Sequence, residues 1–179
     1  MILIPKSKLQ HLASIECVAG NTGIGKFLPN KGGIVAHLTM YDTRLSFITA
    51  HLAAHEGSNF YTNRCDNMRQ ILSQAKFSTK YPNAYDASIL SHYAFVFGDL
   101  NFRIQIPLET QNHEEHVDSV LKLVEKKDWI TLSIYDELLK AIQIGDFCNG
   151  FRTLPCHFPP TFKLKRSDGF QYKSQRTPR

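Results

Sequence analysis

The fold is decided by the stretch 92–103, H-Y-A-F-V-F-G-D-L-N-F-R, in which a dense apolar run ends in glycine and polar residues. The run 92–97 predicts a strand buried inside a sheet, because short apolar segments bounded by turn residues are typical of such strands. Asp99 and Asn101 follow it two residues apart, so on an extended segment their side chains point the same way. A sheet holds polar groups at a strand's end in fixed positions, which favours a functional site there.

Asp99 and Asn101 suit two tasks of phosphoryl transfer. A carboxylate can orient or deprotonate a water molecule, and a carboxamide can donate a hydrogen bond to a phosphate oxygen. Positioning and charge neutralisation dominate that reaction. The same residue types also favour turns, so the pattern by itself leaves a plain strand-to-loop turn as the alternative.

The elements predicted on both sides of this stretch mix strands and helices without a regular strand–helix–strand rhythm. On the N-terminal side the sequence predicts strands at 14–19, 34–41 and 44–50, a glycine-rich loop at 20–33, a hairpin turn at 41–43 and a helix at 62–76. On the C-terminal side it predicts helices at 117–125 and 133–144, a C-cap at Gly145 and an extended segment at 158–163. The mixed order favours an α+β fold, an α/β sandwich, over a doubly wound parallel sheet.

Three other motifs have weaker functional interpretations. The segment 20–26, G-N-T-G-I-G-K, fits a phosphate-binding P-loop, but Phe27 stands where that loop needs a Ser or Thr, which favours a flexible glycine loop. The segment His51-Leu-Ala-Ala-His55 lacks the Glu of a zinc-protease motif, which favours one structural histidine and one site histidine. The segment His113-Glu-Glu-His116 indicates a solvated helix start, because acids favour a helix N-terminus.

The composition indicates a single soluble domain with an anionic partner. The chain has 179 residues, enough for one domain over 1–179, and its formal net charge of +5 favours a phosphate, a nucleic acid or an acidic membrane surface as partner. Its four cysteines show no paired spacing, which indicates free thiols in a reducing compartment. No apolar run reaches the length of a membrane span, so the expectation is a cytoplasmic protein with peripheral membrane contact.

Several motifs, taken in order, resemble the inositol polyphosphate 5-phosphatase family over nearly the whole chain. They are Asn30-Lys-Gly-Gly33, His51-Leu-Ala-Ala-His55, Phe97-Gly-Asp-Leu-Asn-Phe-Arg103 and Phe158-Pro-Pro-Thr-Phe-Lys163, with weaker support from Tyr135-Asp-Glu-Leu138, Gly150-Phe151 and Gln175-Arg-Thr-Pro178. The resemblance implies a deoxyribonuclease-I-like, four-layer fold with two packed mixed β-sheets flanked by helices, present here incompletely. It also implies a Mg²⁺-dependent phosphatase that acts on phosphoinositide lipids or soluble inositol polyphosphates and has no nucleic acid as partner.

The resemblance further implies roles for individual residues. Asp99 acts on the attacking water, Asn101 holds that water and the scissile phosphate, and His51 hydrogen-bonds the phosphate. These three form the expected catalytic set. The expected substrate-binding set, which includes a loop near the other phosphates and contacts to the neighbouring 4-phosphate, is Asn30, Lys31, His55, Arg103, Lys163 and Arg176.

The chain also departs from the family pattern. Phe162 stands where a Tyr is usual, Pro29 replaces a common Gly, and the region 165–174 lacks the usual acidic character. The family's N-terminal T-W-N and metal-binding Glu, and its later W-x-D-R and S-D-H motifs, have no counterpart in the chain. No metal ligand is therefore certain, and we expect the chain by itself to be marginally folded and to lack Mg²⁺-dependent phosphatase activity.

Two alternatives remain open at the level of sequence. One is a nuclease of the same fold, since nucleases also use G-D-x-N, although the motifs around Lys31 and Lys163 argue against it. The other is a non-catalytic phosphoinositide-binding protein, which the missing metal ligand favours.

Overall fold

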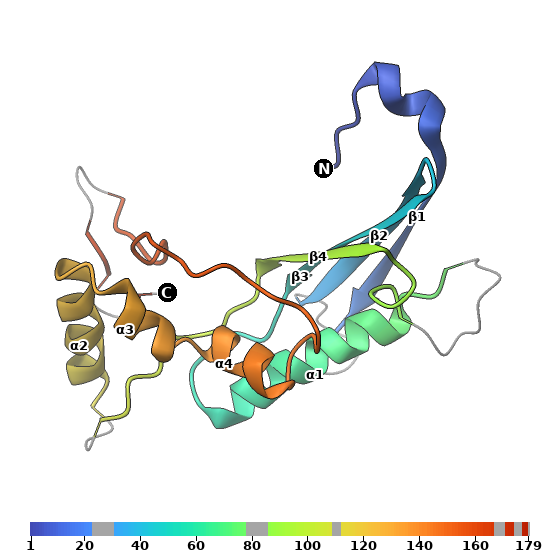
Figure 1. The fold of residues 1–179 in the computed structure, drawn as a ribbon. Coiled ribbons are helices and arrows are strands. Elements are labelled where there is room, and N and C mark those ends of the chain that lie inside the picture. The colour runs from blue at the N-terminus through green and yellow to red at the C-terminus, as the bar shows by residue number, and fades with distance from the viewer. Residues whose placement is uncertain (23–30, 78–85, 109–111, 167–170, 174–176, 179) are drawn as a thin grey trace. The chain divides into compact units, whose positions relative to one another are not determined.

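The computed structural model describes residues 1–22, 31–77, 86–108, 112–166, 171–173 and 177–178 (Figure 1). These residues divide into two compact units, Met1–Asn101 and Phe102–Arg179. No helix in the described part of the chain is long and apolar enough to cross a membrane.

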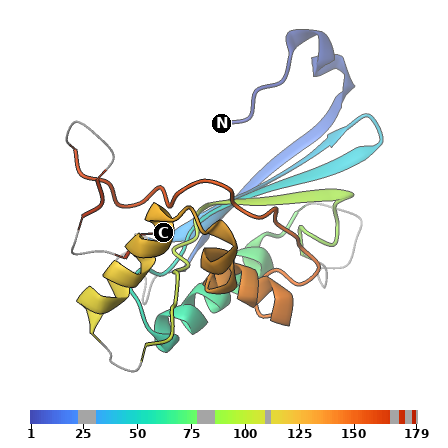
Figure 2. The same cartoon turned by 60° about the vertical axis from the view of Figure 1, so that its left-hand side comes forward.

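The first unit is built on a four-stranded sheet in which the strands follow one another in chain order (Figures 1 and 2). A short 3-10 helix, η1 (Lys6–His11), precedes β1 (Leu12–Asn21), β2 (Gly32–Met40), β3 (Thr43–His51) and β4 (Tyr93–Asp99). The first two pairings are antiparallel, and β3 pairs with β4 in parallel. All four expected strands and the turn between β2 and β3 are confirmed.

One face of this sheet is covered by helix α1 (Ser58–Gln74), which contacts β1 and β2. Inward residues of the sheet and the helix interleave, and Ile48 and Ile71 have no exposed surface. Burying a large aliphatic side chain stabilises a fold by about 1.5–3 kcal/mol. At Gly33 of β2 an added Cβ would come within 2.9 Å of the Ile71 side chain, so the lack of a side chain there leaves room for the helix.

Strand β4 is not the fully buried strand that its apolar run predicts. Tyr93, Phe95 and Phe97 are 62%, 48% and 50% exposed. They alternate with Ala94 and Val96, and Val96 lies beside the buried Ile48 of β3. Since side chains alternate between the faces of a sheet, the three aromatic rings lie on the face opposite α1. The run is apolar because both faces of the strand carry apolar groups, although one face is open to solvent.

The second unit contains three helices around a small core. They are α2 (His113–Glu125), α3 (Trp129–Ile134) and α4 (Glu137–Ile144). Val120 of α2 and Leu132 of α3 pack with Ile104 at the centre of this core. Asn112 caps α2 by accepting a hydrogen bond from the Glu114 N–H at 2.9 Å, which confirms the predicted helix start.

The single helix predicted at 133–144 is wrong, because the chain breaks at Tyr135 and Asp136. The Tyr135 carbonyl accepts a hydrogen bond from the Gln105 N–H at 2.8 Å, and Asp136 pairs with Ile104 in an antiparallel bridge. The Asp136 carboxylate then caps α4 through the Leu138 N–H at 2.7 Å. The segment at Ile104 and Gln105, which is distant in the sequence, thus interrupts a helical pattern that is continuous in the local sequence.

Of two further predictions on the C-terminal side, the C-cap at Gly145 is confirmed and the extended segment at 158–163 is wrong. Gly145 ends α4 in the left-handed conformation, with φ of 82°, as predicted. The segment 158–163 is not uniformly extended, since it bends at Phe158 and turns at Phe162 and Lys163. The α+β fold class itself is confirmed by the mixed sheet and by the helices that accompany it.

Candidate functional site

The candidate site forms at the edge where β3 and β4 end and β2 begins. The parallel register pairs His51 with Asp99, and the antiparallel register pairs His51 with Gly32. Leu52, the next residue after β3, donates its N–H to the Asp99 carbonyl at 3.0 Å. Lys31, which directly precedes Gly32, is thereby brought to the same edge. Backbone pairing alone gathers these side chains from three separate parts of the sequence.

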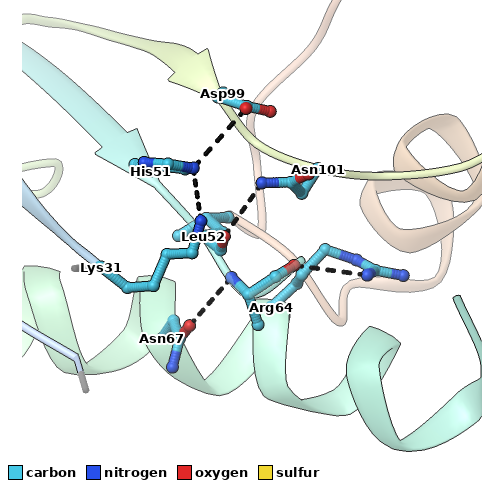
Figure 3. Close-up of polar contacts among 8 residues, drawn as sticks. Lys31, His51, Leu52, Arg64, Asn67, Asp99 and Asn101 are labelled. Carbon is cyan, nitrogen blue, oxygen red and sulfur yellow. Dashed lines mark hydrogen bonds and ion pairs between the residues drawn. The ribbon is translucent and has the colours of Figure 1, made fainter. Parts of the chain in front are cut away.

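Lys31, His51 and Asp99 make side-chain contacts with one another (Figure 3). His51 Nε2 lies 3.6 Å from Asp99 Oδ2, and Lys31 Nζ hydrogen-bonds the same imidazole nitrogen. An ammonium has only donors, so the Lys31 ammonium is the donor in this contact. The second contact of the imidazole is with the Asp99 carboxylate. About half of each of these two side chains, 52% and 51%, is exposed, so an external ligand can reach them.

Asn101 is held beneath this edge. Its φ is 60°, a left-handed conformation that Asn tolerates better than most residues. The Asn101 Nδ2 group donates to the Leu52 carbonyl at 3.0 Å, and only 5% of the residue is exposed. The contact couples Asn101 to the residue that follows His51, so the two predicted catalytic residues are fixed by one short segment.

Gly98 allows β4 to approach β3 closely just before Asp99. Its φ is 130°, and a Cβ added there would lie 2.2 Å from the Ala50 carbonyl oxygen. A side chain at this position would therefore push the end of β4 away from β3. The glycine that the motif carries is required by the backbone that positions Asp99 beside His51.

Two residues of α1 that the sequence analysis did not identify hold the loop after His51. The Arg64 Nη1 group donates to the His55 carbonyl at 2.9 Å and lies 3.5 Å from the Ala53 carbonyl. The Asn67 Oδ1 atom accepts from the Ala53 N–H at 3.2 Å (Figure 3). Arg64 has no exposed surface. The sequence offered one signal for Arg64. It lies four residues before Met68, which places it on the apolar face of the helix.

The histidines of the H-x-x-x-H motif have different surroundings. His51 lies in the cluster, whereas the His55 ring packs on Phe60 with the two centroids 5.2 Å apart. Both residues are exposed. His55 has φ of 76°, and its structural contribution comes from its carbonyl group, which Arg64 holds. His51 thus contributes its side chain to the cluster, whereas His55 contributes its backbone carbonyl to the structure of the loop.

The remaining predicted residues lie in the second unit or outside the described residues. Arg103 is buried, with 4% of its surface exposed, and its N–H donates to Glu137 Oε2 at 2.8 Å. The Lys163 ammonium lies 5.6 Å from the centroid of the Phe162 ring. Asn30 and Arg176 lie outside the described residues.

Asp99 is the carboxylate that this cluster offers to a cation. Among the residues that the structure describes, no group of three His, Cys, Asp or Glu side chains could hold a metal ion. A hard divalent cation such as Mg²⁺ is commonly held by one or two carboxylates, with water and substrate phosphate as its other ligands. The described residues therefore fit such an ion only in part, as one oxygen ligand.

The chain is similar to several inositol phosphate phosphatases. It is 26% identical over 171 residues to the type I inositol polyphosphate 5-phosphatase 2 of Arabidopsis thaliana, covering 94% of this chain and 25% of that protein. It is 33% identical over 165 residues to the inositol-1,4,5-trisphosphate 5-phosphatase 1 of Schizosaccharomyces pombe, covering 92% and 14%. It is 34% identical over 169 residues to the human phosphatidylinositol 4,5-bisphosphate 5-phosphatase A, covering 92% and 15%. The chain thus spans a quarter or less of the length of these three relatives.

Solved structures agree with this relationship. The inositol polyphosphate 5-phosphatase domain of SPsynaptojanin, in complex with inositol (1,4)-bisphosphate and calcium, is 29% identical with a TM-score of 0.78. The match covers 97% of this chain and 46% of that one. A Cimex nitrophorin matches 97% of this chain and 53% of its own at 24% identity and a TM-score of 0.65, which shows a shared fold alone. The sequence over residues 1–179 matches the endonuclease/exonuclease/phosphatase family 2, and the chain belongs to this family.

Proposed function

We propose that the domain to which this chain belongs removes the 5-phosphate from phosphoinositides or soluble inositol polyphosphates. The observation that carries the proposal is the cluster of Lys31, His51 and Asp99 at one sheet edge. Similar proteins are named as 5-phosphatases, and one was solved with inositol (1,4)-bisphosphate, which is inositol 1,4,5-trisphosphate without its 5-phosphate.

The side chains of the cluster supply complementary parts of a phosphate hydrolysis. The exposed Asp99 carboxylate orients a water molecule and accepts its proton as the oxygen attacks phosphorus. The bond between phosphorus and the inositol oxygen breaks, and that oxygen takes a proton from solvent. Lys31 lies where its ammonium can donate hydrogen bonds to phosphate oxygens, and His51 is proposed to hydrogen-bond the same phosphate, which spreads the developing negative charge. Asn101 keeps the segment after His51 in place and is proposed to orient water and phosphate.

Mg²⁺ is the proposed cofactor. It would neutralise charge on the scissile phosphate. Since Asp99 is proposed to take the proton of the attacking water, and the described residues offer no group of three metal ligands, the cation would depend on substrate phosphate oxygens for its ligands. Metal and substrate are therefore expected to bind together more tightly than either binds alone.

Substrate selection is proposed to come from cations outside the cluster. A multiply phosphorylated ring needs several positive side chains, and Arg grips phosphate with two parallel hydrogen bonds. Lys163 and Arg176 are the proposed contacts to a 4-phosphate, with Asn30, His55 and Arg103 as further substrate-binding residues. A lipid substrate would bring the protein to a membrane surface from the cytoplasm, the compartment that four free cysteines favour.

The test compares substrates that differ in one phosphate. Because the chain covers 46% of the SPsynaptojanin domain, a chimera in which it replaces the matching part of that domain is the suitable protein. We expect phosphate release from inositol 1,4,5-trisphosphate and from phosphatidylinositol 4,5-bisphosphate, and none from the corresponding 4-phosphates. Equal release from substrates with and without the 5-phosphate would contradict the proposal.

A second candidate, which the sequence leaves open, is phosphoinositide binding without catalysis. It predicts that the chimera binds inositol 1,4,5-trisphosphate and leaves it intact. A nuclease would instead bind DNA in competition with the inositol phosphate, which a binding assay with both ligands measures.

A further inference from the structure

A further candidate site lies on a two-stranded ribbon in the second unit, formed by residues 163–165 and 171–173. Leu164 pairs with Tyr172 in an antiparallel bridge, and two backbone hydrogen bonds of 2.7 and 2.9 Å flank the pair. The Tyr172 hydroxyl also donates to the Pro160 carbonyl at 2.5 Å, which ties the ribbon to the preceding segment. The ribbon is therefore a defined frame for the side chains that it carries.

The side chains on this frame are mostly cationic. A hollow of about 520 Å³ is lined by Lys163, Leu164, Lys165, Arg166 and Lys173. Four of its five lining residues are positively charged, and none is acidic. Lys165, Arg166 and Lys173 are exposed, so their charges are open to solvent.

The clustered positive charges are not neutralised by described neighbours. No acidic side chain among the residues that the structure describes forms an ion pair with any of the four cations. Lys163 and Lys173 are joined by the Lys173 N–H donating to the Lys163 carbonyl, so like charges lie side by side on the two strands. Adjacent like charges destabilise a strand pair. A ligand with several negative charges would relieve that repulsion.

The surroundings favour one kind of polyanion. In the same unit Leu154 is 84% exposed and Phe158 is 57% exposed, and both come shortly before the ribbon in the sequence. Phe158 stands two residues before Pro160, whose carbonyl the ribbon holds through the Tyr172 hydroxyl. Cations together with exposed aliphatic and aromatic groups on one segment suit the boundary between lipid headgroups and acyl chains. A nucleic acid would match the charge but would leave the aliphatic Leu154 in water.

We propose that this ribbon docks the protein onto a membrane surface that carries anionic phospholipids. This docking rests on the proposed function, because it serves an enzyme whose substrate is a membrane lipid. Three of the four cations, Lys165, Arg166 and Lys173, lie outside the substrate-binding set expected from the sequence. Lys165, Arg166 and Lys173 therefore act on the bulk lipid surface, while Lys163 keeps its proposed contact with the 4-phosphate of the single substrate headgroup.

The test measures sedimentation of the 179-residue chain with phosphatidylcholine vesicles, with and without phosphatidylserine. We expect binding only when phosphatidylserine is present, and weaker binding as salt rises. Lys165→Gln/Lys173→Gln should lower the partition coefficient about tenfold or more. The matched control, Lys126→Gln/Lys140→Gln, removes the same charge from two exposed positions of the same unit and should change it less than about twofold.

Equal losses in the two double variants would overturn the proposal, since net charge rather than the ribbon would then drive binding. Equal binding to vesicles with and without phosphatidylserine would also overturn it. So would tight binding of a DNA duplex or of a soluble inositol polyphosphate at the ribbon without vesicle binding. Because these vesicles carry no 5-phosphate, failure here leaves the proposed phosphatase function standing, and failure of phosphate release leaves the docking result standing.

Discussion

At the residue scale, the buried Arg64 guanidinium is the clearest case of a side chain that supports the site from outside it. It holds two carbonyl groups of the loop after His51. We expect Arg64→Met, which keeps the length and apolar stem, to lower the free energy of unfolding by about 1.5–3 kcal/mol, because hydrogen bonds to a charged group are lost. Urea unfolding measures the change.

Arg69 supplies the matched control for this change. It lies on the same helix, but its side chain is 59% exposed and pairs with Asp66 three residues away. Exposed ion pairs contribute little, so Arg69→Met should cost less than about 0.5 kcal/mol. Similar costs for the two variants would show that the loop is not held by Arg64.

Gly98 tests whether the close approach of β3 and β4 is needed. Gly98→Ala puts a Cβ at 2.2 Å from the Ala50 carbonyl oxygen and also demands φ of 130° from alanine. The control is Gly57→Ala, whose φ is 109° and whose nearest contact would be 3.9 Å away. Both variants carry the backbone strain of about 1–3 kcal/mol, and the first alone carries the clash. Thermal unfolding should therefore show a clearly larger loss for Gly98→Ala, and an equal loss would mean that the strands separate at no cost.

At the element scale, a hydrogen-bond network joins β2 and β3 to the segment before β4. His37 Nδ1 lies 2.9 Å from Ser46 Oγ, and the hydroxyls of Ser46 and Ser91 both donate to the Ala87 carbonyl, at 3.1 and 2.7 Å. His37 is 3% exposed. The Ser46 and Ser91 hydroxyls also lie 2.6 Å from each other, and burial of the imidazole favours its neutral form.

This network makes stability depend on pH. Burial lowers the pKa of His37, Glu16 opposes that shift and Arg44 adds to it. The folded state thus binds this proton less readily than the unfolded state, so the contribution is fully present above about pH 6.5 and is lost as pH falls from there toward the folded pKa. Urea unfolding at pH 8 and pH 5.5 should show a smaller loss in His37→Gln than in the wild type. The same slope in His37→Gln would contradict this assignment, and His157→Gln, at an exposed position, is the control that should keep it.

The elements also show what local sequence reasoning can and cannot recover. The hairpin of β2 and β3 and the α1 helix follow from alternation and from helical spacing, which are local properties. The break between α3 and α4 does not, because it depends on Ile104 pairing with Asp136 from far along the chain. The exposure of Phe95 and Phe97 was missed for a related reason, since a continuous apolar run does not say how many faces are covered.

At the scale of the whole molecule, the sequence motifs identified the family and the members of the cluster, but not how they meet. Asp99 and Asn101 were found from their spacing, and His51 and Lys31 from the resemblance. The contact between His51 and Asp99 comes from the parallel pairing of β3 with β4, which no local pattern reveals, and Lys31 reaches them through the antiparallel pairing of β2 with β3. Arg64 and Asn67 were missed because they act through backbone groups of another segment. Asn30 and Arg176 lie outside the described residues, so their roles stay predictions.

The central claim is that Asp99 activates water for removal of the 5-phosphate, and its most direct test is kcat. In the chimera with SPsynaptojanin, with saturating phosphatidylinositol 4,5-bisphosphate, we expect Asp99→Asn to lower kcat by about 10²–10⁴-fold with little change in KM, because proton transfer from water is a transition-state task. The exposed Asp118 of α2 provides the control, and Asp118→Asn should leave kcat unchanged. A kcat for Asp99→Asn within about twofold of the unmodified chimera would contradict the claim, since the observed cluster would then have no part in the chemistry.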